Sequence, residues 1–255
     1  MSRVTYIGID PGDRRQPFTF AALDGERTIL ALSQGPMDAV LAYAAGQAGA
    51  ITAINGPLCF NQGRMAQEKD RAGLNPPPRP GEWTDLRVVE YQLALRQAPV
   101  SHTPSGKGYC PKWIRRAVEL STELQQRLGF SLFDDGEEPC HLLEAQAEVC
   151  FWSLLGGTAP FAAGSLEGRL QRQLVLHDEK LPVPDPMDFF EEVTRFKLLK
   201  GILPVKDVYS QPELNALVTA YTAWLTVNKP ERVETVGASE EGKIWLPMRN
   251  AVVPQ

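Results

Sequence analysis

A single carboxylate ends the first apolar segment of this chain. Residues 4–13 read VTYIGIDPGD, so Asp10 follows an apolar run and precedes Pro-Gly. A charge at the end of a buried segment is costly unless a cation or hydrogen-bond donors compensate it. Asp10 is therefore either a turn residue exposed to water or a ligand for a metal ion or another molecule.

Three further polar residues stand in comparable places. Asn55 ends the apolar run ITAIN, Glu144 follows HLL, and Asn215 shares a polar stripe of one helix with Thr219 and Thr222. Ligands of open α/β sheets gather outside the carboxyl ends of the central strands. The spacing therefore predicts that Asp10, Asn55 and Glu144 lie along one edge of a sheet.

Each of these residues also has a simpler interpretation. Asp10 and Asn55 both suit turns that contain Gly and Pro. Glu144 suits the first turn of a helix, where the helix dipole favours an acid. Glu148 lies four residues further on, on the same side of that helix. Arg87 and Glu90 are three apart, as in a surface ion pair of small energetic effect.

The elements that must position these residues follow from hydrophobic periodicity, caps and turn signals. Hairpin strands come first and helix-separated strands afterwards, which predicts an α/β protein with a mixed sheet and helices on both faces. A capping box, Ser210 with Glu213, opens the last strong helix. The predicted strands cover 4–9, 17–25, 27–34, 51–60, 141–143 and a terminal ribbon within 231–247, and the predicted helices cover 36–50, 84–97, 112–129, 144–157, 164–177, 186–200 and 210–228.

Residues 61–128 form a loop and helical insertion after the fourth strand, and they are cationic. They carry eleven basic and seven acidic residues, whereas the whole chain has a net charge of −5. Basic side chains either contact phosphates or are simply solvated. The candidates for contacts with nucleic acid are Arg14, Arg15, Lys112, Arg115 and Arg116.

Composition narrows the classes further. With 255 residues, 43% of them hydrophobic, the chain is typical of a globular protein, and no apolar run is long enough to cross a bilayer. No secretory segment precedes the first strand, so we expect a cytoplasmic protein without a membrane partner. Four cysteines without a CxxC pair and three dispersed histidines argue against disulfides and zinc.

Short motifs in a fixed order resemble one family across nearly the whole chain. They read GIDPG, AINGPL, RVVEYQL, HTP, EAQAE, EGRLQR, LNALVTAYTA and GKIWLP. This series resembles the domain of unknown function 429 family, which is predicted to consist of nucleases with an RNase H-like fold. The resemblance implies one RNase H-like domain over residues 1–255.

The resemblance also implies a chemistry. Relatives of this kind would hold two Mg²⁺ or Mn²⁺ ions and hydrolyse nucleic-acid phosphodiesters. Asp10 and Glu144 would be metal ligands, Asn55 and Asn215 would occupy the remaining catalytic positions, and Arg87, Glu90 and Glu148 would support them.

This chain departs from the family pattern, which has acids where Asn55 and Asn215 stand. An amide brings an oxygen but no charge, and divalent-ion affinity follows the charge of the ligands. Either catalysis is lost and a nucleic-acid- or protein-binding surface remains, or neighbouring acids such as Glu148 or Glu213 restore the charge. A small-molecule phosphotransferase of the actin-like superfamily would share the opening strands, but it would need a second phosphate loop.

Overall fold

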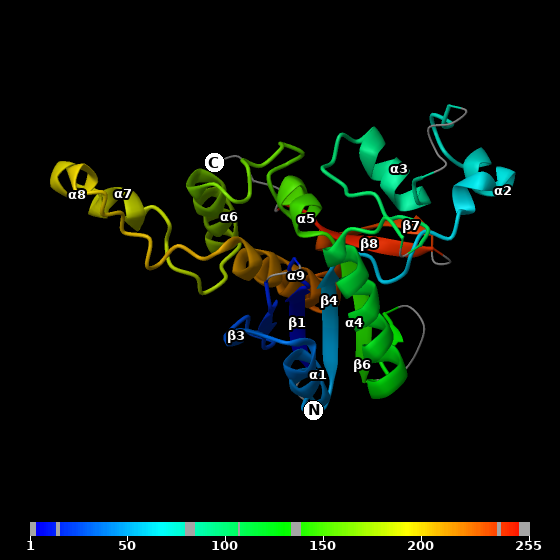
Figure 1. Ribbon diagram of the computed structural model, residues 1–255, viewed down its shortest axis with the longest axis horizontal. Helices are drawn as coiled ribbons and strands as arrows, with labels where there is room; N and C mark the ends of the chain where they lie inside the picture. The colour runs from blue at the N-terminus through cyan, green and yellow to red at the C-terminus, as the bar shows by residue number, and fades with distance from the viewer. Residues whose placement is uncertain are drawn as a thin grey trace.

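The computed structural model describes residues 4–13, 16–79, 85–106, 108–133, 139–238 and 241–249. Over these ranges the protein is α/β, with a mixed eight-stranded sheet (Figure 1). The strands are β1 (Thr5–Asp10), β2 (Phe18–Leu23), β3 (Ile29–Gly35), β4 (Ala50–Asn55), β5 (Ser131–Leu132), β6 (Cys140–Ala145), β7 (Val233–Ala238) and β8 (Gly242–Pro247). The longer helices are α1 (Met37–Ala45), α3 (Val88–Leu95), α4 (Lys112–Leu128), α5 (Ala147–Leu154), α6 (Leu166–Asp178) and α9 (Gln211–Asn228).

The strand order is β3-β2-β1-β4-β6-β8-β7, and β5 pairs with β6 beside this path. The hairpin strands β2 and β3 are antiparallel, whereas β1, β4 and β6 run parallel. Ile9 pairs with Ile54, and Asn55 pairs with Ala145. This register brings the carboxyl ends of three parallel strands to one edge, as the sequence predicts.

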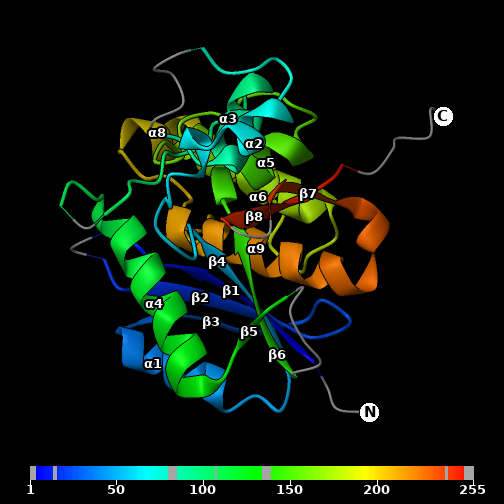
Figure 2. The same ribbon diagram turned by 90° about the vertical axis from the view of Figure 1, so that its right-hand side faces the viewer.

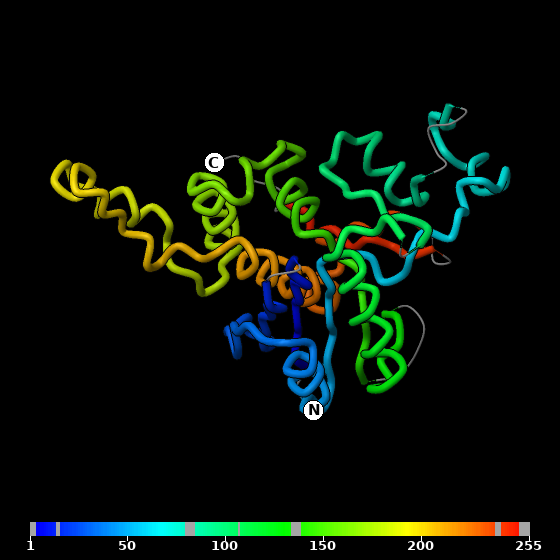
Figure 3. The backbone as a smooth tube through the Cα atoms, viewed as in Figure 1, coloured from blue at the N-terminus to red at the C-terminus, as the bar shows by residue number. Residues whose placement is uncertain are grey.

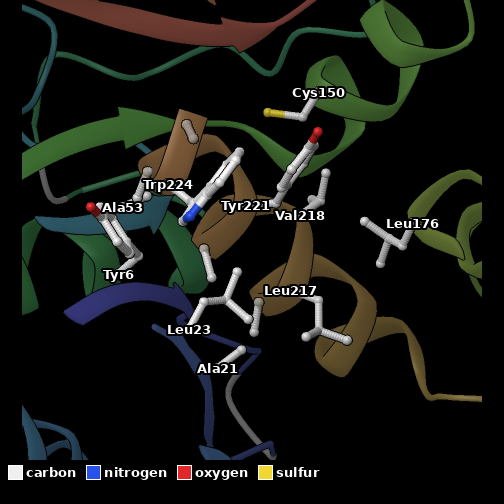
Figure 4. Packing of buried hydrophobic residues seen from close by; sticks show 14 of the residues in the cluster. Tyr6, Ala21, Leu23, Ala53, Cys150, Leu176, Leu217, Val218, Tyr221 and Trp224 are labelled. Atoms are coloured by element: carbon white, nitrogen blue, oxygen red, sulfur yellow. The ribbon is translucent and has the colours of Figure 1, made fainter. Parts of the chain in front are cut away.

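Strand β1 is buried on both faces, and its side chains alternate between two cores. Tyr6 packs with α5, α6 and α9 in one cluster, whereas Ile7 and Ile9 pack with α1 and α4 in the other. Figure 2 shows α1 and α4 on one side of the strands and α9 on the other. The aromatic rings of Tyr221 and Trp224 fill the α9 side (Figure 4). The predicted helices on both faces of the sheet are confirmed.

Gly8 allows α9 to cross β1 at close range. A Cβ atom at this position would lie 2.1 Å from the carbonyl oxygen of Ala216 and 2.2 Å from the amide nitrogen of Ala220. Only a residue without a side chain permits this approach. The close crossing carries the first turn of α9, and with it Asn215, to the end of β1.

Several predicted boundaries need correction. The helix expected over residues 84–97 begins at Val88, because Arg87 and Glu90 form its cap, and Thr84 lies outside the described residues. The loop predicted after Asn61 contains a 3₁₀ turn (Arg64–Ala66) and the short helix α2 (Glu68–Ala72).

The helix predicted over 186–200 is two short helices, α7 (Asp188–Glu192) and α8 (Arg195–Leu199). Val193 between them is extended, and the Thr194 side chain caps α8 by accepting a hydrogen bond from the amide of Lys197. Figures 1 and 3 show that this part of the chain projects away from the sheet and returns to α9.

Candidate functional site around Asp10

Three polar side chains from distant parts of the chain converge at the end of β1. Asp10 ends β1, Asn55 ends the neighbouring β4, and Asn215 is the fifth residue of α9. The Asn55 Nδ2 donates to Asp10 Oδ2 at 3.0 Å, and the Asn215 Nδ2 donates to the same oxygen at 2.6 Å. The backbone amide of Gly12 donates to the other carboxylate oxygen at 2.7 Å. Amide donors therefore surround the Asp10 carboxylate.

The Asn55 amide is held from both ends. Its Oδ1 accepts a hydrogen bond of 2.8 Å from the backbone amide of Ala147, the first residue of α5. That bond leaves Nδ2 facing Asp10. If the amide turned over, the Asn55 nitrogen would face the Ala147 amide, and a buried donor would lose its acceptor at a cost of about 1–3 kcal/mol. Asn55 is thus a fixed donor to Asp10.

Asn215 is anchored at one end only. It is 6% exposed, and its Oδ1 is buried without a hydrogen-bond partner among the described residues. Its Nδ2 makes the short bond to Asp10. An unpaired buried acceptor is unfavourable. This oxygen is therefore a group at the site whose hydrogen-bonding capacity is unused.

Burial raises the pKa of the Asp10 carboxyl above its ordinary value. The hydrogen bonds from Asn215, Gly12 and Asn55 and the charge of Arg116 work in the opposite direction but do not cancel the effect. Amides stabilise a carboxylate as dipoles, whereas a contacting cation would also remove its net charge. Asp10 therefore favours a proton, a cation or further donors.

A pocket of about 340 Å³ opens over Asp10. It lies between the end of β1, the start of α9, the start of α4 and the chain before α5. Its lining combines carboxylate, amide and hydroxyl side chains with Trp113 and three prolines. The lining residues are Asp10, Pro11, Gly12, Asp13, Gln16, Asn55, Pro99, Ser101, Trp113, Gln146, Glu148, Gln211, Pro212 and Asn215.

The structure does not bring Glu144 to Asp10. In the parallel register Glu144 pairs with Ile54, one residue before Asn55, and successive side chains of a strand point to opposite faces. Arg87 binds Glu144 through two hydrogen bonds, Nη1 to Oε2 at 2.9 Å and Nη2 to Oε1 at 2.6 Å. The residue expected to share a metal with Asp10 is instead paired with a guanidinium.

Arg87 and Glu90 are not a surface ion pair. Both side chains are completely buried, and the Arg87 Nε donates to Glu90 Oε1 at 2.8 Å. The same Glu90 oxygen accepts the backbone amide of Thr103 at 3.0 Å. Although burial works to lower the pKa of Arg87, Glu144 and Glu90 raise it above its ordinary value. The charge of Arg87 thus ties two carboxylates into one structural cluster.

Two other acids that would restore charge at Asp10 have partners of their own. The Oε2 of Glu148 accepts a bond of 2.7 Å from the buried Arg172, while its Oε1 has no hydrogen-bond partner among the described residues. The Oε2 of Glu213 accepts from the amide and hydroxyl of Ser210 in the predicted capping box. Of the two acids, only Glu148 lines the pocket.

Of the five basic residues predicted to contact nucleic acid, three lie on α4 and two lie outside the described residues. Arg116 lies near the pocket, where its Nη1 donates to the carbonyl oxygens of Asp13 and Gln16 and its guanidinium stacks over Phe18. Lys112 and Arg115 belong to the same first turns of α4. The remaining candidates, Arg14 and Arg15, lie outside the described residues.

Sequence reasoning missed most of the pocket wall and one buried acid. Trp113, Ser101 and Gln211 line the pocket but lie outside the quoted motifs, and Gln146 lies inside EAQAE without having been singled out. Glu241 is 2% exposed and accepts from the backbone amide of Val88 at the start of α3. A Trp one residue after Lys112 in a cationic helix was the available signal for the pocket.

Among the described residues, no group of three or more His, Cys, Asp and Glu side chains is arranged to hold a metal ion. The described helices also include none with the length and apolar character needed to cross a membrane. Comparison of the chain with family models, curated proteins and solved structures finds no match.

Proposed function

We propose that this protein has an RNase H-like fold and binds a single nucleic-acid strand at the Asp10 pocket without hydrolysing it. One observation carries the proposal: the amide nitrogens of Asn55 and Asn215 both donate to Asp10 Oδ2. In a metal-dependent nuclease of this fold, that oxygen would face a divalent ion and its other ligands. Here, N–H groups face the oxygen.

The residues present do not fit a pair of divalent ions in this arrangement. Mg²⁺ and Mn²⁺ require oxygen ligands, mostly carboxylate. Asn55 offers its nitrogen and is held so by Ala147, and Glu144 is neutralised by Arg87. One carboxylate flanked by amide donors has neither the charge nor the exposed oxygens of a two-metal site.

The surroundings of the pocket favour a nucleic-acid strand. Trp113 lines the pocket, Tyr109 is fully exposed just before α4, and Lys112 and Arg116 are four apart on one face of that helix. Aromatic rings that stack on bases, next to cations that contact phosphates, are typical of single-strand binding. The pocket also offers hydrogen-bond acceptors. The exocyclic amino group of a base can donate a hydrogen bond to a carboxylate such as that of Asp10.

The first experiment restores the missing charges. We expect millimolar Mn²⁺ to leave the melting temperature of the wild type unchanged and to raise that of the Asn55→Asp, Asn215→Asp double variant. Saturation at a hundred times the dissociation constant adds about 2.7 kcal/mol. Asn228→Asp, on the exposed end of α9, is the matched control. Stabilisation of the wild type by Mn²⁺ that Asp10→Ala abolishes would contradict the proposal.

The second experiment measures binding of fluorescein-labelled single strands by anisotropy. We expect Trp113→Ala to weaken binding about tenfold, since stacking contributes about 1–3 kcal/mol per base. Lys112→Ala should reduce the slope of affinity against salt by about one. Tyr43→Ala, on α1 and outside the pocket, is the control. If neither DNA nor RNA strands bind at low salt, the nucleic-acid part of the proposal fails.

Metal-dependent hydrolysis is the second candidate, and one observation favours it. Asn215 Oδ1 and Glu148 Oε1 are both buried without hydrogen-bond partners among the described residues, and both residues line the pocket. Rotation of the Asn215 amide would present an oxygen beside Asp10. Cleavage of a labelled strand by the wild type in Mn²⁺, absent in Asp10→Ala, would support this candidate over the first.

A further inference from the structure

The segment 185–207, here called the arm, projects from the body of the protein (Figures 1 and 3). It also exposes apolar side chains. Its base is anchored, because Phe189 and Val208 pack against Leu170 of α6. Beyond that anchor the chain carries α8, which has no buried residue. The exposed large apolar side chains of the arm are Met187, Phe190, Phe196, Leu198, Leu199, Ile202, Leu203 and Val205, with exposed fractions from 41% to 77%.

This apolar surface is large enough for a specific interface. At roughly 200 Å² for a large apolar residue, the exposed portions sum to on the order of 800 Å² per copy, the area that one partner buries in a standard interface. Exposed apolar surface of this size, gathered in one projecting segment, marks an interaction site. The proposed function uses none of it.

The charges of the arm are segregated by helix. Helix α7 carries three acids, Asp188, Glu191 and Glu192. Helix α8 and the residue that ends it carry three bases, Arg195, Lys197 and Lys200. Within one chain these groups meet only loosely, with 3.7 Å between the Lys197 Nζ and the Glu192 Oε2. One end of the arm is thus acidic and the other basic.

We propose that the occupant of this surface is the arm of a second copy of the chain, paired antiparallel about a two-fold axis. In that arrangement α7 of each copy faces α8 of the other, so acids meet bases twice while the apolar side chains are buried together. A parallel arrangement would place like charges opposite each other. A two-fold interface requires a self-complementary patch, and the opposite charges of α7 and α8 provide one.

The oligomeric state in solution tests the proposal. We expect sedimentation velocity of the wild type to show a dimer between about 1 and 100 µM. The double variant Phe196→Asp, Leu199→Asp should be monomeric with an unchanged circular dichroism spectrum, because both side chains are exposed. Leu30→Asp, an exposed apolar residue of β3, is the matched control and should stay dimeric. A monomeric wild type over this range overturns the proposal.

A charge-swap pair tests whether the charges of the two arms face each other across the interface. The variant Glu191→Lys, Glu192→Lys makes α7 basic, and the variant Lys197→Glu, Lys200→Glu makes α8 acidic. Each variant alone should be monomeric, since in its homodimer α7 of one copy would face α8 of the other with charge of the same sign. An equimolar mixture should recover a heterodimer in which opposite charges face each other at both contacts. Failure of the mixture to associate contradicts the pairing of the two arms through their charges.

Other occupants give different results. If the wild type is monomeric and sediments with vesicles of anionic lipid, and Phe196→Asp, Leu199→Asp abolishes that binding, the arm is a membrane-surface element and the dimer is refuted. The outcome is independent of the Asp10 pocket. None of the arm variants alters a residue that lines it, so the proposed function and the dimer can fail separately.

Discussion

Two buried carboxylates at the same edge of the sheet have opposite surroundings. Glu144 is 1% exposed and receives two hydrogen bonds from Arg87, which is itself completely buried. Asp10 is 6% exposed, and within the described part of the chain its donors at contact distance are neutral. The first charge is matched by another charge, whereas the second is matched by dipoles.

The difference separates a carboxylate with a structural role, Glu144, from a carboxylate that can still bind a ligand, Asp10. In the Arg87 cluster one guanidinium binds both Glu90 and Glu144 and joins α3 to β6, so each of these carboxylates already has a cationic partner. Asp10 has no cation in contact among the described residues, a raised pKa and a pocket above it. A ligand that brings donors or positive charge gains more at Asp10 than at Glu144, which is why we place the binding site there.

The largest expected effect on stability comes from breaking the ion pair between Arg87 and Glu144. Arg87→Met should lower the free energy of unfolding by about 3–5 kcal/mol, because it leaves Glu90 and Glu144 buried without a counter-charge. Urea denaturation followed by circular dichroism measures the change. Arg96→Met is the control, since its ion pair with Glu234 is largely exposed and should contribute less than about 1 kcal/mol. Similar losses of unfolding free energy in both variants would contradict a special role of the buried Arg87 pair.

Gly8→Ala should change the surroundings of Asp10 and leave those of Arg87 unchanged. The added Cβ would lie 2.1 Å from the Ala216 carbonyl oxygen, so α9 must move from β1 at a cost of about 1–3 kcal/mol. We expect the side-chain amide resonances of Asn215 to shift in an NMR spectrum while the Arg87 Nε resonance stays. Gly25→Ala is the control, because a Cβ there meets nothing within 4 Å. Unmoved Asn215 resonances would show that α9 does not depend on Gly8.

The smallest effect is a pH dependence. Since the pKa of Asp10 is raised in the folded state, its contribution to stability is present below its unfolded pKa and is lost as pH rises through the folded pKa. The free energy of unfolding of the wild type minus that of Asp10→Asn should therefore fall from about pH 3 towards neutrality. Denaturation at several pH values measures it, with the exposed Asp38→Asn as the control. A difference that rises with pH would mean that the donors outweigh burial.

Much of the fold followed from local signals. The apolar runs predicted β1 and β4, the Ser210–Glu213 box predicted the start of α9, and the alternation of strands and helices predicted a mixed sheet covered on both faces. These signals are local because strand burial, capping and turn chemistry depend on residues that are neighbours in the chain.

The amino-acid sequence by itself thus determined that Asp10 and Asn55 end apolar strands and that Asn215 belongs to a helix with a polar stripe. Only the tertiary structure decided which groups meet. Asn55 pairs with Ala145, and Glu144 precedes Ala145 by one position. Because successive side chains of a strand point to opposite faces, Glu144 points to the other face of the sheet, where it pairs with Arg87. The orientation of the Asn55 amide depends on a backbone donor ninety-two residues away. Contacts between residues this distant form only when the chain is folded, so no local pattern encodes them.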